Sequence, residues 1–291
     1  MTETKYGKYF ASGSKPGEFR WSYLQEVDTC AYKIDDDRMK GAFFMYVHWI
    51  GPNDGFHFVH APHYHAYTDN LVSMGTNPDD PNDFGGQLEI HLDHGFERHV
   101  ITKPTIVYIP KQLVHGPILW RIRKPVLGLG ISMGPIAEHS RDNELINFKQ
   151  SLEINHAEKI IQGPKPGETR KFFKDAVVYT DDDRVKGSTF IYTKFIKNGA
   201  DLEEAFSKTV TSPYDTILGF IGINPAEKET LNAEIQIAMG KEGEKHTFNK
   251  TTGVFIPHDF VRGPIKCKLN KPFILAVATN GPRMEEIPYK G

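Results

Sequence analysis

The sequence repeats itself, and this repetition constrains the fold more than any other feature. Three pairs of segments match in the same order: KPGEFR and KPGETR (15–20 and 165–170), DDDRMKG and DDDRVKG (35–41 and 181–187), and HVITKPTIVYIP and HTFNKTTGVFIP (99–110 and 246–257). The spacing within each pair stays close to 147 residues. A repeat of this length predicts two homologous structural units in one chain.

The repeat sets the expected domain boundaries. We expect an N-terminal unit at 1–135, a helical linker at 136–155 and a C-terminal unit at 156–291. A chain of 291 residues has room for two domains of ordinary size. Hydrophobic residues make up 39% of the chain and charged residues 25%, so each unit has enough apolar side chains for a packed core.

Each unit is predicted to consist mainly of β-strands. Short runs rich in β-branched and aromatic residues, such as AFFMYVHWI, PTIVYIP, STFIYTKFI and TGVFIP, are separated by Gly, Pro, Asn and Asp. The pattern predicts an all-β chain of two antiparallel barrels or jelly rolls of about 130 residues each. Only the linker and the chain ends have a helical pattern.

Charge and apolar patterning exclude several classes of function. The net charge is −2 without a long basic run, which argues against nucleic acid as a partner. No apolar stretch is long enough for a signal peptide or a membrane-spanning helix. The chain has two cysteines, Cys30 and Cys267, far apart in sequence. We therefore expect no disulfide framework and a reduced, cytoplasmic setting. The sequence is compatible with both a monomer and a homo-oligomer.

The segment APHYHAYTDN at 61–70 contains a candidate metal site. In an extended strand, residues i and i+2 point to the same face, so His63 and His65 project together. Asp69 follows at a distance from which its carboxylate can provide a third ligand. His115, in the later segment IPKQLVHGP, is the candidate for a fourth. We therefore expect these four side chains to bind one divalent ion.

These residues resemble the two motifs of the cupin superfamily. The first cupin motif is H-x-H followed by three or four residues and a carboxylate, and the second is P-x-G-x-x-H. Here His63 and His65 precede Asp69, and Pro110 precedes His115 by five residues. The sequence has Asp where a Glu is usual and Gln112 where a Gly is usual. The resemblance covers both halves and implies a bicupin, that is, two jelly-roll barrels of the double-stranded β-helix type.

The second repeat is an internal control for the metal site. At a spacing of 147 residues, the four candidate ligands correspond to positions without a metal-binding side chain: Val210, Ser212, Thr216 and Arg262. The flanking IP and GPI segments are present in both copies. The ligands therefore vary independently of the scaffold, as expected for a functional site in the N-terminal unit and a degenerate C-terminal unit.

Other candidate residues have competing interpretations. Glu89 and His91 alternate with Leu88 and Ile90, so they share one face of a strand. They are candidate acid–base groups if this face points into the barrel, and ordinary polar residues if it points outward. Arg121 is either a clamp for a substrate carboxylate or a surface residue. The second copy also has a histidine at the position that corresponds to His99, and it also has the DDDR segment. Their presence in both copies favours a structural role for these residues.

The predicted chemistry follows from an ion with open coordination positions. Three imidazoles and one carboxylate suit Fe, Mn, Zn, Ni or Co in the divalent state. Such a centre binds a small substrate through two oxygens, as in a hydroxylated aromatic, a diketone or a hydroxy acid. We expect an enzyme that cleaves or rearranges a C–C bond, with a ring-cleaving dioxygenase as the leading subtype. The alternatives are a metal-dependent hydrolase, lyase, isomerase or decarboxylase, and a non-catalytic regulatory or ligand-binding bicupin.

Overall fold

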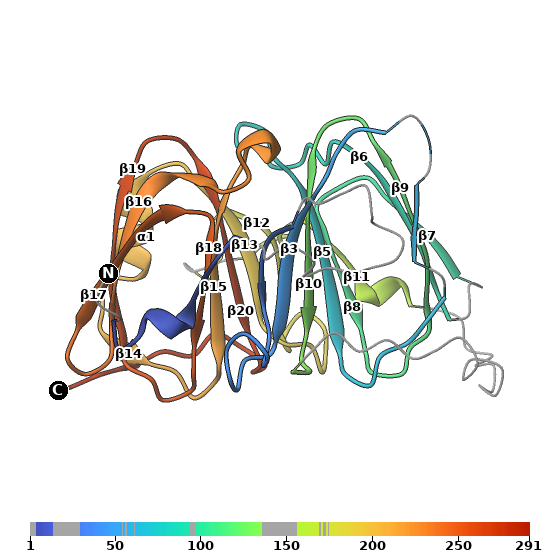
Figure 1. Cartoon of the computed structure of the whole chain (residues 1–291). Helices are drawn as coiled ribbons and strands as arrows, with labels where there is room; N and C mark the ends of the chain where they lie inside the picture. Colours follow the sequence, from blue (N-terminus) through green and yellow to red (C-terminus); the bar gives the residue numbers. More distant parts are fainter. Residues whose placement is uncertain are drawn as a thin grey trace.

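A computed structural model describes most of the chain. The described residues are 4–13, 30–53, 55, 57–60 (backbone only), 62–93, 97–135, 156–168, 170, 173 and 175–291. The helical linker predicted at 136–155 lies outside them. The described part consists mainly of antiparallel strands that form two barrels side by side (Figure 1), which confirms the all-β double-barrel prediction.

The strands of the first half are β1 (Phe10–Ser12), β2 (Cys30–Ile34), β3 (Phe44–Ile50), β4 (His57–His60), β5 (Asp69–Gly75), β6 (Gly86–Leu92), β7 (Glu97–Ile101), β8 (Thr105–Ile109), β9 (His115–Ile122) and β10 (Val126–Ser132). Those of the second half are β11 (Ile160–Gln162), β12 (Ala176–Thr180), β13 (Ile191–Ile196), β14 (Val210–Thr211), β15 (Thr216–Gly222), β16 (Thr230–Met239), β17 (Glu244–Lys250), β18 (Thr252–Ile256), β19 (Arg262–Leu269), β20 (Phe273–Thr279) and β21 (Ile287–Pro288). One α-helix, α1 (Gly199–Ala205), and 3-10 turns at Gly7–Tyr9, Ala157–Lys159 and Pro225–Glu227 complete the described elements.

The strands form four sheets, two for each barrel. The first barrel combines the six-stranded sheet β11-β8-β5-β10-β3-β2 with the four-stranded sheet β4-β9-β6-β7. The second combines the six-stranded sheet β1-β18-β15-β20-β13-β12 with the five-stranded sheet β17-β16-β19-β14-β21. The two six-stranded sheets, here called the central sheets, face each other in the middle of the molecule (Figure 1). The smaller sheets lie on the outside.

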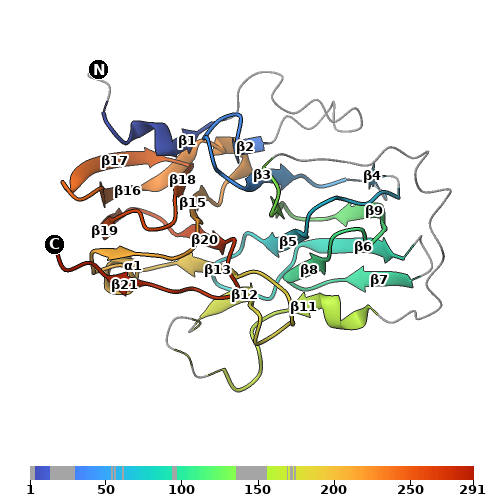
Figure 2. The ribbon, with the colours of Figure 1, turned by 90° about the horizontal axis from the view of Figure 1, so that it is seen from below.

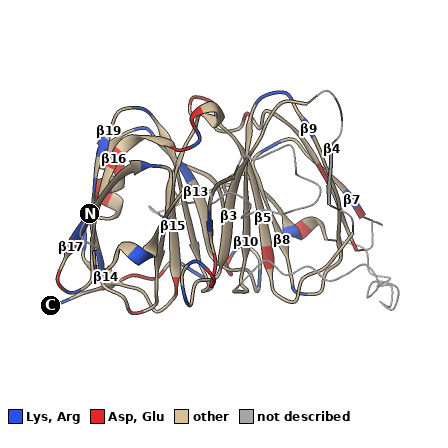
Figure 3. Cartoon of the chain, viewed as in Figure 1, with Lys and Arg blue, Asp and Glu red and all other residues tan. Residues whose placement is uncertain are grey.

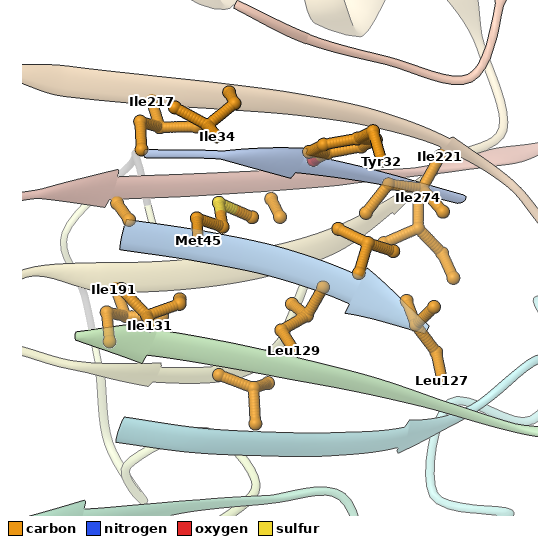
Figure 4. Close-up of a cluster of buried hydrophobic side chains, with 14 of the residues drawn as sticks. Tyr32, Ile34, Met45, Leu127, Leu129, Ile131, Ile191, Ile217, Ile221 and Ile274 are labelled. Carbon is orange, nitrogen blue, oxygen red and sulfur yellow. The ribbon is translucent and has the colours of Figure 1, made fainter. Parts of the chain in front are cut away.

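The central sheets bury a core between the barrels. Strands of a central sheet are largely buried on both faces, because one face lines its own barrel and the other packs against the opposite sheet. The fully buried pattern of β10 and β20 reflects this arrangement. Met45, Leu129 and Ile131 of the first barrel lie opposite Ile217 and Ile274 of the second (Figure 4). Because burial of apolar surface is stabilising, this shared core holds the two barrels together.

Each central sheet includes a short strand that precedes the other barrel in sequence. Strand β1, at the N-terminus, pairs with β18 of the second barrel, and β11, after the linker, pairs with β8 of the first. We call β1 and β11 the exchanged strands. In the view from below they extend the edges of the two central sheets at opposite ends of the molecule (Figure 2). The exchange was not predicted from the sequence, and it adds backbone hydrogen bonds between the halves.

The repeated DDDR segments hold the exchanged strands in place. Asp35 accepts a hydrogen bond from the backbone of Arg38, and the Arg38 guanidinium donates to the carbonyls of Ser12 and Gly13 at the end of β1. Arg184 makes the equivalent contacts with the carbonyls of Gln162 and Gly163 at the end of β11. The predicted structural role of these segments is thus visible in the hydrogen bonds.

The interiors of the two barrels are filled differently. Phe220, Leu275 and Val277 point into the second barrel and belong to its buried core. The corresponding residues of the first barrel are smaller: Ser73, Gly128 and Gly130. The first barrel therefore has room for other side chains at one end, and the candidate metal ligands lie at that end.

The described chain has charged residues of both signs at its surface (Figure 3) and one short α-helix. Lys and Arg are interspersed with Asp and Glu on the loops and outer strands of the described chain (Figure 3). Asn198 caps the N-terminus of helix α1, and its side chain accepts a hydrogen bond from the backbone N–H of Ala200. This helix was not predicted. Among the described residues, no helix has the length and apolar character needed to span a membrane.

Candidate metal centre

His63, His65 and His115 converge inside the first barrel. All three are buried, and one ring nitrogen from each lies within 4.8 Å of the other two. The ring centroids are 4.9 Å apart for His63 and His65, 4.2 Å for His63 and His115, and 5.0 Å for His65 and His115. Within the described chain, this is the one group of three such ligands. We call it the three-histidine cluster.

Backbone hydrogen bonds bring the separate segments of the cluster together. His63 and His115 form an antiparallel bridge, with N···O distances of 3.0 and 2.9 Å. The backbone N–H of Gln112 donates to the carbonyl of His65 at 2.9 Å. Gln112 has φ = 66°, a left-handed conformation that favours glycine. This accounts for the Gly in the cupin motif and shows that the turn forms here without it.

A hydrogen bond orients the His115 ring. Its Nδ1 lies 3.1 Å from the carbonyl oxygen of Leu113. Because a carbonyl only accepts, Nδ1 carries the proton and the lone pair is on Nε2. This contact is typical of metal-binding histidines, whose second ring nitrogen is fixed by a hydrogen bond outside the coordination sphere.

The donor set fits a divalent transition metal. Imidazole nitrogens bind such ions at about 2.0–2.1 Å, which places ligand nitrogens roughly 3.0–3.5 Å apart. The ligand nitrogens of the cluster lie within 4.8 Å of one another, so a bound ion would draw them together by up to about 2 Å. Three neutral imidazoles suit Fe, Mn, Zn, Ni and Co more than Mg or Ca, which prefer oxygen ligands. The cluster therefore has the composition and spacing of a transition-metal site.

Asp69 lies beside the cluster, at the start of β5. Its Oδ2 is 3.1 Å from Nε2 of His65, but it does not belong to the group of ligand atoms within 4.8 Å. Its Oδ1 is buried without a hydrogen-bond partner among the described residues. Burial raises the pKa of Asp69 to about 7, and a hydrogen bond with Ser132 acts in the opposite direction. An unpaired buried carboxylate oxygen next to three imidazoles fits a fourth ligand, and this role stays a prediction.

Tyr46 and His48 line the same barrel interior, and sequence reasoning missed them as pocket residues. They lie on the inner face of β3 and stack on each other, with ring centroids 5.0 Å apart. A Cβ at Gly130 would lie 1.9 Å from the Tyr46 ring, and one at Gly128 would lie 2.4 Å from the His48 ring. The signal was present in the sequence: the first copy has glycine at two alternating positions where the second has leucine and valine.

Burial changes the proton affinity of both rings. It raises the pKa of Tyr46, and the nearby charge of Asp69 adds to this effect. It lowers the pKa of His48 to about 4. Nδ1 of His48 is buried without a hydrogen-bond partner in the described part of the chain. At neutral pH the barrel therefore holds a protonated phenol and a neutral imidazole.

Glu89 and His91 lie on the outer face of β6. Leu88 and Ile90 point into the core of the first barrel, and His115 shares their face because it pairs with Leu92. Glu89 is 2.9 Å from Nε2 of His91, and its other oxygen accepts a hydrogen bond from Arg98 at 2.6 Å. Arg98 lowers the pKa of Glu89 to about 2. Both side chains therefore lie on the face of β6 opposite to Leu88 and Ile90, which is the outward placement of the two considered from the sequence.

The remaining candidates also lie away from the cluster. Arg121 is exposed and lines an outer cavity of about 410 Å³ together with Arg123, while its neighbour Trp120 is buried in the barrel core. His99 is 2.7 Å from Glu97, which also accepts a hydrogen bond from the backbone of His156 ahead of β11. This contact supports the structural role expected for His99.

The second barrel confirms the alignment of the repeats. Val210 pairs with Arg262 as His63 pairs with His115. The backbone N–H of Asp259, at φ = 58°, donates to the carbonyl of Ser212, as that of Gln112 does to His65. The second barrel therefore has the same backbone hydrogen bonds around this position, but without the histidine side chains. The positions compared in the sequence are equivalent in space.

Comparisons with known proteins identify the fold. No family model matches the sequence, and no curated protein sequence does. Solved structures of oxalate decarboxylase are similar: one, from a study of proton-coupled electron transfer, has a TM-score of 0.54 at 9% identity. Another, from a study of the Mn(II) centres of the Bacillus subtilis enzyme, has a TM-score of 0.54 at 10% identity. Each alignment covers 91% of this chain and 78% of the other. A likeness at this level of identity establishes the two-barrel cupin fold.

Proposed function

We propose that this chain, a bicupin in fold, is a divalent-metal-dependent enzyme that cleaves or rearranges a C–C bond in a small oxygenated substrate. The observation that carries the proposal is the convergence of His63, His65 and His115 in one barrel. The same frame in the other barrel has no histidine at the equivalent positions. Packing alone does not require three imidazoles at this place, because the second barrel folds without them.

The charge of the site indicates the class of substrate. Three neutral imidazoles leave a divalent ion with its full charge, and Asp69 offsets at most one unit. A substrate that is anionic and chelates through two oxygens offsets the rest. Hydroxy acids, dicarboxylates, enediolates and hydroxylated aromatic acids have this property. When bound, the metal supplies a Lewis acid that stabilises the negative charge formed as the bond breaks.

Tyr46 and His48 are the groups that we propose for proton transfer near this site. The phenol of Tyr46 is protonated at neutral pH, and burial raises its pKa further, so it acts as a hydrogen-bond donor. The imidazole of His48 stays neutral because burial lowers its pKa to about 4, so it acts as an acceptor. Their stacking on Gly128 and Gly130 fixes both rings in one position. A positioned acid or base contributes about 10²–10⁴-fold to rate.

Two subtypes of the reaction differ in their need for oxygen. Ring-cleaving dioxygenation of a hydroxylated aromatic acid consumes O₂ and is the subtype favoured from the sequence. Decarboxylation or another lyase reaction is the alternative, and the structurally similar proteins carry the name decarboxylase. A non-catalytic bicupin that binds a small ligand is the candidate from another class. The stacked pair of Tyr46 and His48 inside the first barrel favours an enzyme over this third candidate.

Metal analysis and activity screening test the proposal together. Protein purified without added metal should contain about one equivalent of a transition metal, His115→Ala should lose most of it, and His258→Ala, at an exposed histidine of the second barrel, should not. Turnover of hydroxy acids, dicarboxylates and hydroxylated aromatics is then compared in air and under anaerobic conditions. Tyr46→Phe should keep its metal and lose at least about 100-fold in kcat.

The outcomes separate the candidates. Oxygen uptake in step with product formation identifies a dioxygenase, and turnover without oxygen identifies a lyase or decarboxylase. Ligand binding without turnover identifies a binding protein and refutes the enzyme proposal. Unchanged metal content in His115→Ala refutes the site itself.

A further inference from the structure

Arg262 occupies the position in the second barrel that His115 occupies in the first. It is the first residue of β19 and is 2% exposed. Its Nη2 forms an ion pair with Oε1 of Glu286, and the guanidinium lies 5.2 Å from the centre of the Phe206 ring. A full positive charge is therefore buried at the end of a barrel that lacks metal ligands.

The guanidinium uses only part of its hydrogen-bonding capacity. Nη1 of Arg262 is buried without a hydrogen-bond partner among the described residues. The residues at the other former ligand positions, Val210, Ser212 and Thr216, are buried and uncharged. An arginine can bind both oxygens of a carboxylate through two parallel N–H···O hydrogen bonds. Here Glu286 accepts one hydrogen bond, from Nη2 of Arg262. This end of the second barrel thus has the chemistry of a carboxylate-binding site in which one of the two arginine donors has no partner among the described residues.

The carboxylate that fills it comes from a weakly attached segment. Glu286 precedes β21, a two-residue strand that pairs with β14 at two positions. One further backbone hydrogen bond, from Tyr289 to Thr209 at 3.0 Å, holds the segment after it. Ile287 is 48% exposed, and the Glu286 side chain is 27% exposed. Few contacts have to break for this tail to leave the barrel end.

We infer that the second barrel contains a carboxylate-binding site centred on Arg262, in which Glu286 of the same chain acts as a tethered ligand that a small free carboxylate can replace. A free carboxylate that reaches both Nη1 and Nη2 satisfies the donor that Glu286 leaves unpaired. It competes with a tethered group at high effective concentration, so the intact chain binds it weakly and a chain without Glu286 binds it more tightly. Binding releases the tail that carries β21.

Chemical rescue with acetate tests this inference in the full-length chain. Glu286→Ala removes the tethered carboxylate and should lower the thermal unfolding midpoint. Acetate, compared with chloride at equal ionic strength, should raise the midpoint of this variant in a saturable manner, with an apparent affinity at least 10-fold tighter than for the wild type. Glu285→Ala, at the exposed neighbouring residue, should behave like the wild type. Because every variant keeps the first barrel, acetate binding at the three-histidine cluster cancels in the comparison.

A double variant and an exchange measurement make the test decisive. Arg262→Met combined with Glu286→Ala should give no acetate response, because the binding group is absent. In the wild type, acetate should speed hydrogen exchange of the Tyr289 amide by releasing the tail, and this measurement stands even if the variants fail to fold. An equal response to acetate and chloride, a response that survives Arg262→Met, or unchanged exchange at Tyr289 would each overturn the inference.

Discussion

Adding one methyl group at Gly130 tests whether the first barrel is shaped around Tyr46. A Cβ at this position would lie 1.9 Å from Cε1 and 2.6 Å from Cζ of the Tyr46 ring. Carbon atoms in contact are normally about 3.5–4.0 Å apart, so the ring has to withdraw by about 1.5–2 Å. Because the Tyr46 ring stacks on His48 inside the barrel, its displacement also disturbs that contact.

The expected cost of Gly130→Ala is about 1–3 kcal/mol, the usual range for overpacking a core. This corresponds to a factor of roughly 5–150 in the unfolding equilibrium. Gly51→Ala is the matched control. A Cβ at Gly51 meets no atom within 4 Å, so we expect a change within about 0.5 kcal/mol in either direction.

Denaturant unfolding of a double-mutant cycle measures the interaction directly. Tyr46→Leu removes the ring atoms that collide with the new methyl group. In that background, Gly130→Ala should cost less than about 0.5 kcal/mol, which gives a coupling free energy of about 0.5–3 kcal/mol. Equal costs of Gly130→Ala with and without the Tyr46 ring would show that the glycine has no special relation to it, and the account of the pocket walls would be wrong.

Three further predictions concern the site and its frame. Gln112→Gly should stabilise the protein by about 0.5–1 kcal/mol, because glycine adopts the left-handed conformation without strain, whereas Gln87→Gly should destabilise it in the same denaturant titration. Burial lowers the pKa of His48 from 6.5 to about 4, so the unfolded chain binds a proton there that the folded chain does not, and this group lowers stability by up to about 1.4 kcal/mol per pH unit as the pH drops from about 6.5 to 4. Asp69, whose pKa burial raises to about 7, acts in the opposite direction over this range, so the measurement is the stability difference between the wild type and His48→Gln, which should change with pH by the His48 contribution. Asp69→Asn should weaken metal binding by about 10–100-fold in competition with a chelator, and an unchanged affinity would exclude the carboxylate from the site.

Much of the fold was predictable because the chain carries two copies of one plan. Matching segments at one spacing predicted two similar barrels, and the equivalent bridges His63–His115 and Val210–Arg262 confirm the register. The exchanged strands were not predictable. Each is three residues long, too short for a periodic pattern, and each pairs with a strand far away in sequence.

The three-histidine cluster was also predicted, because strand alternation places His63 and His65 on one face and the second motif supplies His115. Which face of β6 points into the barrel could not be predicted from the sequence. Alternation divides Glu89 and Ile90 between two faces, but it does not say which face encloses the site, and tertiary packing decides this. The exact position of the Asp69 carboxylate depends on side-chain rotation, which the sequence pattern does not describe.

The two barrels share one backbone arrangement but carry different side chains at the equivalent end of the barrel. The first places three nitrogen ligands for a cation at the end of the barrel, and the second places the cationic side chain of Arg262 at the equivalent position. Metal ligands are lost from the second copy, yet its strands remain necessary, because β11 completes a sheet of the first barrel and the central sheets bury each other. A duplicated chain of this kind can change the chemistry of one barrel while the other keeps its own. The buried positive charge of Arg262 favours a negatively charged partner at this end of the second barrel, and in this chain that partner is the carboxylate of Glu286.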